Sequence, residues 1–399
     1  MTVTAEHDVV IVGAGPAGMA TAISLARSGR RVLLVERRNN RRSNSGETIA
    51  PAAKITVKRL LGPVLDGPLP DWAAETRGNI SVWGSEEPAS QDYAFNPYGS
   101  GLCIDRAGFD HAMLTVVRGL GVDVIMGATI TDAEYSDGRW SFSLRTRQGA
   151  KRRQSAYLVD GTGRTAALSR GLGIDGAAHD PLFAYAARFS VPGDRAGADR
   201  SAANSDRDGT TRIEACAYGW WYSNRLPKAA GAPAERLLVL HTDRDSDAGR
   251  MARSMDGFLA LLSETVMMRR MLDTHGYVPG GRLTGSPAGQ RALPVIAAPG
   301  FLAVGDAAQT HDPLSSQGIE RALQSGTHAG HALQYALSNA SEPEAFLGRY
   351  QQQMSAHWQR YLQQHAQYYG MEPRWSGQRF WARRRALRTT RNEFARDAL

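Results

Sequence analysis

The chain contains 399 residues, of which 42% are hydrophobic, 8% aromatic and 22% charged. This composition is typical of globular proteins and excludes a disordered chain, a collagen-like fibre and a membrane-embedded protein. The length predicts two or three structural units. Two cysteines, Cys103 and Cys216, are too few for a disulfide framework or a four-thiolate metal site, and no other spacing of side chains predicts a metal site.

The net charge of +8 at pH 7 is concentrated in a basic stretch at residues 37–42 and in an arginine-rich tail. Neither has the interleaved aromatic residues of a base-stacking surface, so we expect no nucleic-acid partner. We expect the tail to be a solvated helix, and the alternative is a docking surface for an acidic partner. The tail arginines are Arg379, Arg383, Arg384, Arg385, Arg388 and Arg391.

No stretch reaches the roughly 18 apolar residues that a membrane-spanning helix needs. Near the N-terminus, Glu6 and Asp8 precede an apolar run that glycines and a proline interrupt, which is unlike a secretory signal. We therefore expect a cytoplasmic protein without a membrane span.

The first predicted elements form a βαβ unit of about thirty residues. A short β-branched run over residues 8–12 predicts a buried parallel strand, and residues 19–28 predict a helix that ends at Gly29. Residues 31–36 predict the second strand. The turn between the first strand and the helix is glycine-rich, and it carries the first chemical signal of the sequence.

This turn, Gly13-Ala14-Gly15-Pro16-Ala17-Gly18, satisfies the dinucleotide fingerprint. The first glycine permits a tight turn, the second lets the backbone approach a pyrophosphate, and the third allows the helix to pack on the strand. Glu36 ends the next strand, where a carboxylate accepts the ribose hydroxyls of an adenosine. Arg37 and Arg42 are expected to neutralise the pyrophosphate or bind the adenine side, with solvated surface as the alternative.

The remaining pattern predicts an α/β fold: a Rossmann-type nucleotide domain, an inserted antiparallel-sheet substrate domain and a C-terminal helical segment. We place the nucleotide domain at residues 1–180 and 290–340, the substrate domain at 181–289 with parts of 55–100, and the helical segment at 341–399. Residues 37–52 and 192–209 are expected to be loops. The other predicted elements are a helix over 104–119, strands over 122–126, 140–147, 157–160, 183–191, 216–222, 237–242 and 300–304, and a helix over 317–336.

Four later segments resemble the flavin motifs of the p-hydroxybenzoate hydroxylase-like flavoproteins. Residues 301–308 form an apolar strand that ends in Gly-Asp, residues 313–319 resemble the segment beside the flavin ring, and residues 157–164 resemble the middle Asp-Gly motif. Arg106 resembles the arginine that begins a helix near the adenine. The resemblance implies that the dinucleotide is FAD. It assigns to FAD the residues Arg106, Asp160, Gly161, Gly305, Asp306, Pro313, Ser316, Gln317, Gly318 and Ile319, besides those of the fingerprint.

Two segments narrow the resemblance to the tryptophan-halogenase-like branch of this group. Residues 45–51, with Gly46, Glu47 and Thr48, resemble the flavin-contacting loop of that branch, and residues 312–319 resemble its late segment. The stretch Gly219-Trp220-Trp221-Tyr222, followed by Leu226-Pro227, is most similar to flavoproteins that mature cysteine tryptophylquinone enzymes by oxidising a protein-borne tryptophan.

The sequence departs from the halogenases at two places. Halogenases carry a lysine about thirty residues after the Gly-Glu loop, but residues 77–83 contain none, and Lys54 and Lys58 come too soon after Glu47. The halogenase Trp-x-Trp-x-Ile-Pro signature is replaced by residues 220–227. These departures make a halogenase a less favoured reading.

Glu47 and His311 are the candidate catalytic side chains. Glu47 is expected to orient the flavin or the substrate, or alternatively to cap the helix near Ala52. His311 follows the Gly-Asp motif and is expected to act as a base or hydrogen-bond donor, or else to satisfy loop backbone. Trp220 and Tyr222 share one face of a strand and are expected to line an aromatic substrate pocket, with ordinary core packing as the alternative.

The resemblance implies an FAD-dependent monooxygenase that hydroxylates an electron-rich aromatic ring through a flavin C4a-hydroperoxide. The expected co-substrates are O2 and NAD(P)H, or a separate flavin reductase in place of NAD(P)H. The expected substrate is an aromatic small molecule or a tryptophan-containing peptide or protein. The alternatives are an FAD-dependent oxidase or double-bond reductase, a halogenase, and a flavin-holding partner protein without turnover.

Overall fold

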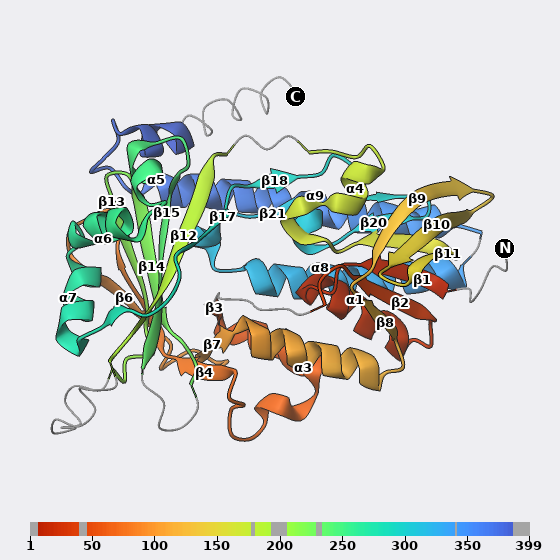
Figure 1. Cartoon of the computed structure of the whole chain (residues 1–399), viewed down its shortest axis with the longest axis horizontal. Helices are drawn as coiled ribbons and strands as arrows, with labels where there is room; N and C mark the ends of the chain where they lie inside the picture. The colour runs from red at the N-terminus through yellow and green to blue at the C-terminus, as the bar shows by residue number, and fades with distance from the viewer. Residues whose placement is uncertain are drawn as a thin grey trace.

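The computed structural model describes residues 7–39, 46–176, 180–192, 206–228, 234–339 and 341–385. Two large sheets lie side by side along the long axis of the molecule, with helices packed around them (Figure 1). This mixed α/β fold, with a parallel Rossmann-type sheet, an antiparallel sheet and C-terminal helices, confirms the predicted fold class.

The first sheet contains the predicted βαβ unit. Its strands are β1 (His7–Val12), β2 (Val32–Glu36), β8 (Asp123–Met126), β9 (Thr129–Ser136), β10 (Arg139–Thr146), β11 (Gly149–Asp160), β19 (Ala297–Ala298) and β20 (Phe301–Ala303). The parallel strands run in the order β20-β11-β1-β2-β8. The strands β1 and β2 are apolar and buried, as expected for parallel strands that are covered on both faces of their sheet.

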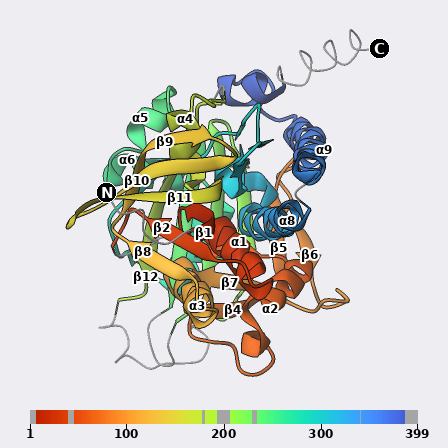
Figure 2. The same ribbon diagram turned by 90° about the vertical axis from the view of Figure 1, so that its right-hand side faces the viewer.

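Three helices pack beside this sheet. Helix α1 (Pro16–Arg27) follows the glycine turn and packs against both α3 (Arg106–Gly119) and α8 (Gly318–Ser338), as Figure 2 shows from the end of the molecule. Helix α8 begins within one residue of the predicted start. Because β20 and α8 come late in the chain, the nucleotide fold is assembled from segments that are far apart in sequence.

The second sheet is mainly antiparallel. Its strands are β5 (Gly78–Val82), β6 (Ala89–Asp92), β12 (Leu182–Ser190), β13 (Thr211–Cys216), β14 (Gly219–Arg225), β15 (Glu235–Asp243), β16 (Val278–Pro279) and β17 (Thr284–Pro287). One face packs on α5 (Asp247–Met251), α6 (Met255–Ser263) and α7 (Met267–His275) through a core that includes Trp221 and Leu240. The predicted single strand over 216–222 is wrong, because the chain turns after Cys216 and returns as β14.

Smaller elements connect the two sheets. The expected loop over 37–52 contains β3 (Gly46–Ile49), which pairs with β7 (Gly101–Asp105), and β7 pairs in turn with β4 (Ala73–Thr76). This correction matters, because β3 carries Glu47 and Thr48. The other short elements are α2 (Lys54–Leu61), α4 (Ala167–Gly171), β18 (Arg291–Ala292) and β21 (Gln309–Thr310).

The described part of the C-terminal segment packs against the rest of the chain, unlike the solvated helix that we expected for the arginine-rich tail. Helix α9 (Pro343–Gly370) packs along α8, and Phe380 and Trp381 beyond it pack against residues of the second sheet. Arg384 is buried and donates hydrogen bonds to Asp180 and Asp243, while Arg383 pairs with Asp243 and Asp245. The described tail arginines therefore dock within the chain, and Arg388 and Arg391 lie outside the described residues.

No helix among the described residues is long and apolar enough to cross a membrane.

Candidate functional site

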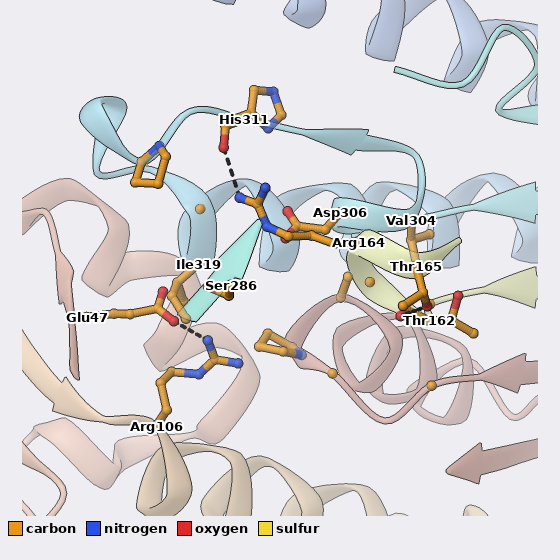
Figure 3. Close-up of a pocket in the computed structure, with 18 of the residues that line it drawn as sticks. Glu47, Arg106, Thr162, Arg164, Thr165, Ser286, Val304, Asp306, His311 and Ile319 are labelled. Carbon is orange, nitrogen blue, oxygen red and sulfur yellow. Dashed lines mark hydrogen bonds and ion pairs between the residues drawn. The ribbon is translucent and has the colours of Figure 1, made fainter. Parts of the chain in front are cut away.

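A cavity of about 880 Å3 lies between the two sheets, and both contribute to its lining (Figure 3). Its volume is in the range of pockets that hold cofactors and substrates. One end is formed by the glycine turn and the end of β2, and the other end by β12, β14, β15 and β17. The sequence-predicted residues that line it are Gly13, Gly15, Pro16, Ala17, Glu36, Arg37, Glu47, Thr48, Arg106, Gly161, Trp220, Tyr222, Asp306, His311, Pro313, Ser316, Gly318 and Ile319.

The glycine turn fits a pyrophosphate. Gly13 has a φ of +104°, and a Cβ there would overlap the carbonyl oxygen of Gly161, while a Cβ at Gly18 would overlap that of Gly13. Gly15 begins α1 without any side-chain hydrogen bond, and the first turn of α1 has no acidic residue. The first N–H groups of α1 and the positive end of its dipole are therefore available to a phosphate in the cavity.

Glu36 is fixed at this turn by two backbone hydrogen bonds. Its Oε2 accepts from the Ala14 N–H at 3.0 Å, and its Oε1 accepts from the Arg38 N–H at 3.0 Å. The side chain is buried, and both Glu36 and Arg37 line the cavity. A carboxylate held in this way is suited to the ribose hydroxyls of an adenosine.

Arg164 connects three segments of the cavity wall. Its Nε lies 3.3 Å from Oδ2 of Asp306, and its two Nη atoms donate to the carbonyl oxygens of Gly289 and His311, each at 3.0 Å. Burial raises the pKa of Asp306, and the positive charge of Arg164 opposes this rise. The sequence motif contained Arg164, but its spacing gave no reason to assign it a role.

Glu47 and Arg106 form an ion pair at the cavity (Figure 3), and Arg106 also pairs with Asp110 one helical turn later. Arg106 thus lines the cavity beside Glu47 of β3, and its expected position near the adenine stays a prediction. The alternative that Glu47 caps the following helix is wrong, because neither the short turn at Pro51 nor α2 has a side-chain cap.

The His311 imidazole packs edge-on against the rings of Tyr361 and Trp358 of α9. Burial and the nearby Arg321 lower the pKa of His311 to about 3, so its ring is neutral. Beyond it, Gly318 and Ile319 place the N-terminus of α8 at the cavity, and no side chain caps that end. The positive end of the α8 dipole therefore favours negative charge in the cavity.

The far wall of the cavity is one face of the second sheet. Trp220 pairs with His241 and Tyr222 pairs with Val239, so these four side chains share a face, while Trp221 points to the opposite core. The Trp220 indole stacks on the His241 imidazole at 3.7 Å between ring centroids. Burial lowers the pKa of His241 to about 3, which leaves it uncharged.

A hydrogen-bond chain connects this wall to the loop after β21. The Trp220 Nε1–H donates to the Tyr369 hydroxyl at 3.0 Å, and that hydroxyl donates to Oδ2 of Asp312 at 2.7 Å. The Asp312 N–H donates to the Tyr361 hydroxyl, and His365 lies 3.3 Å from Oδ2. His365 is buried because it lies on the inner stripe of α9 with Tyr361 and Tyr369.

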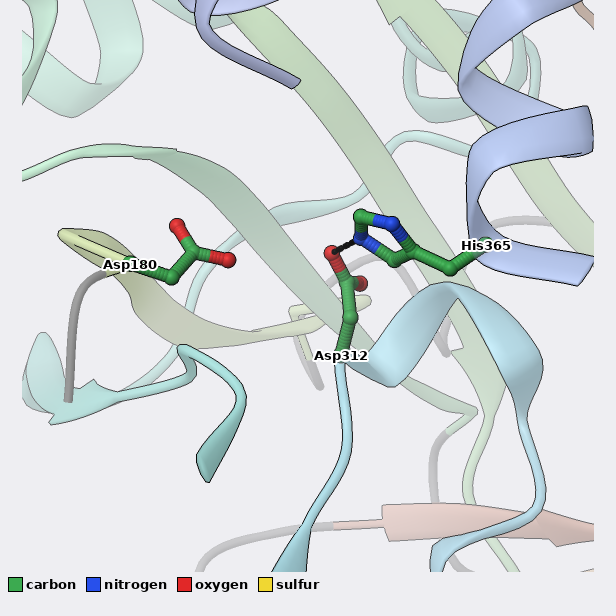
Figure 4. A group of neighbouring side chains, drawn as sticks. All are labelled: Asp180, Asp312 and His365. Carbon is green, nitrogen blue, oxygen red and sulfur yellow. Dashed lines mark hydrogen bonds and ion pairs between the residues drawn. The ribbon is translucent and has the colours of Figure 1, made fainter. Parts of the chain in front are cut away.

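Asp312, His365 and Asp180 form a buried group, drawn in Figure 4. Burial would raise the pKa of Asp312, but the hydrogen bond and charge of His365 lower it to about 2. Burial raises the pKa of Asp180, whose carboxylate accepts from Arg384 at 3.0 Å. Arg384 therefore supplies positive charge to this group from within the chain.

Some predicted residues lie behind the cavity lining. Asp160 is fully buried, and its carboxylate accepts hydrogen bonds from the backbone and hydroxyl groups of Thr162 and Ser169. Asp160 therefore stabilises the turn and does not face the cavity. The side-chain oxygen of Gln317 accepts a hydrogen bond from Arg321. The predicted residues outside the lining are Gly18, Gly46, Asp160, Gly305 and Gln317. Arg42 lies outside the described residues.

Sequence reasoning missed most of the far wall. Leu237, Val239 and His241 alternate along a predicted strand, and this alternation is the signal that would have placed them on one face. Nothing in the sequence shows that this face turns to the cavity, because that depends on the packing of two distant sheets. The missed lining residues of the second sheet are Ala184, Ala186, Leu237, Val239, His241 and Ser286.

Comparison with known proteins places the chain among flavoproteins. Residues 8–171 match the family model described as FAD dependent oxidoreductase. LodB of Marinomonas mediterranea, named as an FAD-dependent oxidoreductase, is 30% identical over 393 residues, which are 96% of this chain and 98% of that protein.

Two solved structures share the fold. The myxobacterial FAD-dependent halogenase CndH has a TM-score of 0.82 at 20% identity, and the match covers 96% of this chain and 86% of CndH. QhpG, described as a peptidyl tryptophan dihydroxylase essential for tryptophylquinone cofactor biogenesis, has a TM-score of 0.72 at 22% identity over 95% of this chain and 79% of QhpG. From its near full-length similarity to LodB and its dinucleotide-binding turn, the chain belongs to the FAD-dependent oxidoreductases.

Proposed function

We propose that the protein is an FAD-dependent monooxygenase that hydroxylates an electron-rich aromatic ring, namely the indole of a tryptophan that is carried by a peptide or protein. The observation that carries this proposal is the single cavity that joins the dinucleotide-binding turn to an aromatic wall on the second sheet. Ala184 and Ala186 lie on the same wall as Trp220 and Tyr222, and their small side chains leave space for a flat ring. Bound FAD would supply oxygen activation and the transfer of one oxygen atom.

The chain itself would bind, orient and exclude water. The turn at Gly13 and Gly15 would hold the pyrophosphate, and Glu36 and Asp306 would hold the ribose and ribityl hydroxyls. The N-terminus of α8 would stabilise negative charge beside the flavin ring. The apolar wall would keep water from the reacting ring and fix its orientation.

The lysines of the chain argue against halogenation. The resemblance to halogenases would require a lysine at the reaction site, and the chain has Lys54, Lys58, Lys151 and Lys228, all within the described residues. None of them lines the cavity. The full-length similarity to LodB supports an FAD-dependent oxidoreductase, and the fold shared with QhpG, which is described as a peptidyl tryptophan dihydroxylase, favours oxygen insertion on tryptophan.

The test supplies the flavin-loaded enzyme with NAD(P)H, with and without a flavin reductase, oxygen, and either free tryptophan amide or a tryptophan-containing peptide. The expected product has gained one or two oxygen atoms on the indole, as read by tandem mass spectrometry. The matched control is the same peptide with phenylalanine in place of tryptophan, which should stay unchanged. A change of two hydrogens without oxygen would instead support the oxidase or double-bond reductase alternative.

A further inference from the structure

Strand β17 is an edge strand that also forms part of the cavity wall. It pairs with β12 through the register Ala184–Ser286 and Ala186–Thr284, and no other described strand pairs with it. Gly285, Ser286 and Pro287 are exposed to solvent, yet Ser286 also lines the cavity. The cavity therefore opens to solvent at β17.

The outer edge of β17 presents main-chain groups for pairing. The Ala288 N–H donates to the Leu182 carbonyl at 2.9 Å. This bond shows which residue pairs between β17 and β12 are hydrogen-bonded and which are not. Because antiparallel pairing alternates, the N–H and C=O of Gly285 and the C=O of Pro287 point away from β12. Pro287 has no N–H, so a strand added to this edge would obtain its hydrogen bonds mainly at Gly285.

The side-chain direction at β17 matches the cavity. Ser286 shares the cavity face with Ala184, its partner on β12. An extended peptide paired with Gly285 would therefore send its residue beside Ser286 onto the same face, because side chains of neighbouring strands in register point the same way. This geometry would deliver one side chain of a polypeptide into the cavity.

Two arginines flank the strand. Arg282 is exposed two residues before Thr284, and Arg244 is exposed with its guanidinium over the ring of Phe183, which pairs with Pro287 at the other end. A segment with acidic residues on both sides of its aromatic residue would complement these charges.

We propose that β17 is the docking strand for an extended, acidic segment of a protein substrate, which adds to the sheet edge and places its tryptophan in the cavity. This inference rests on the proposed function for the identity of the side chain, and on the exposed edge and the cavity mouth for the mode of binding. β-Strand addition gives affinity through main-chain hydrogen bonds and leaves specificity to the inserted side chain.

The first experiment follows amide hydrogen exchange in the flavin-loaded protein with a nine-residue, acetylated and amidated peptide that has a central tryptophan and two glutamates on each side. Exchange at Gly285 is expected to slow on binding. Strand β6, an exposed edge at the other end of the same sheet, is the internal control and should not change. Absence of binding, or binding without protection at Gly285, would overturn the proposal.

The second experiment leaves the protein unaltered and N-methylates the peptide at one backbone position at a time. Methylation at alternate positions should weaken binding by about fivefold or more, the effect of one lost hydrogen bond, while the positions between should tolerate it. A loss without this alternation would mean that side chains alone dock the peptide, and would overturn strand addition. Oxygenation of free tryptophan amide is scored separately, so a docking failure and a failure of the proposed reaction give different results.

Discussion

At the scale of single residues, the cavity wall combines small side chains with large ones on the same face of the sheet. Ala184 and Ala186 of β12 share a face with Trp220 and Tyr222 of β14, with β15 between the two strands. The Tyr222 hydroxyl is held by Thr48 of β3 at 2.7 Å, so this side of the wall is fixed by a contact with the three-stranded sheet of β3, β7 and β4. The free space therefore lies on the alanine side, where the cavity opens at β17.

The substitution Ala186→Leu tests this assignment. The added carbons would project into the cavity, so we expect kcat/KM for the tryptophan peptide to fall by about tenfold, the effect of roughly 1–2 kcal/mol of steric cost. The visible absorbance of bound flavin should be unchanged, because Ala186 lies on the sheet wall. The matched control is Ala150→Leu, at an exposed strand position of β11 outside the cavity. An unchanged kcat/KM in Ala186→Leu would contradict the placement of the substrate on this wall.

At the scale of elements, local motifs were predictable and long-range packing was not. The strand–glycine turn–helix unit could be predicted because its residues are adjacent in sequence and each glycine has a backbone reason to be there. The burial of the C-terminal half of α9 could not, because its inner stripe of Tyr361, His365 and Tyr369 is polar and lacks the apolar period of a packed helix. These side chains are buried because they hydrogen-bond to or contact Asp312, which lies about fifty residues earlier in the chain.

Helix α9 therefore holds the loop after β21, which contains Asp312, in its position at the cavity. In Tyr369→Phe, Asp312 would lose a hydrogen bond and the Trp220 N–H would lose its acceptor. We expect the unfolding free energy of the holoprotein in urea to fall by about 2 kcal/mol, the range for a hydrogen bond to a charged group. We also expect more of the consumed NAD(P)H to yield hydrogen peroxide instead of product, because the loop is no longer held.

The neighbouring residue provides the control for this prediction. Tyr368 is on the same helix but half-exposed, and its side chain makes none of the contacts to Asp312. Tyr368→Phe should change the unfolding free energy by less than about 0.5 kcal/mol and leave the peroxide fraction unaltered. Equal effects in both variants would show that α9 has no special connection to the cavity.

At the scale of the whole molecule, a buried arginine of the C-terminal segment neutralises buried carboxylates of the second sheet and of the segment that leads into it. Arg384 lies between Asp180 of the connecting segment and Asp243 of β15, and Asp312 extends this group to the loop at the cavity. The two neutral histidines, His241 and His311, lie in the same region, where Arg164 disfavours a further positive charge on either ring. Acidic pH should therefore lower the free energy of unfolding by weakening the packing between the two sheets.

The sign follows from the histidine pKa values. An unfolded histidine takes up a proton below a pH of about 6.5, whereas His241 and His311 in the folded protein stay neutral down to a pH of about 3. The contribution of these two histidines to the free energy of unfolding is therefore fully present above a pH of about 6.5. It falls as the pH is lowered towards 3, by about 2 kcal/mol for each histidine at pH 5. Below a pH of about 4, Asp312 adds to this loss of stability. Its lowered pKa keeps its carboxylate ionised in the folded protein, whereas the same carboxylate takes up a proton in the unfolded chain.

Urea unfolding of wild type, His241→Gln and His311→Gln at pH 7 and pH 5 measures each contribution. Each variant should lose about 2 kcal/mol less stability than wild type between these two pH values. Asp180 and Asp306, whose pKa values are raised, contribute a pH dependence of the opposite sign, but they are common to all three proteins and cancel in the comparison. If a variant showed the same pH dependence as wild type, its histidine would have to be protonated in the folded state, and the buried, uncharged wall described for the cavity would be incorrect.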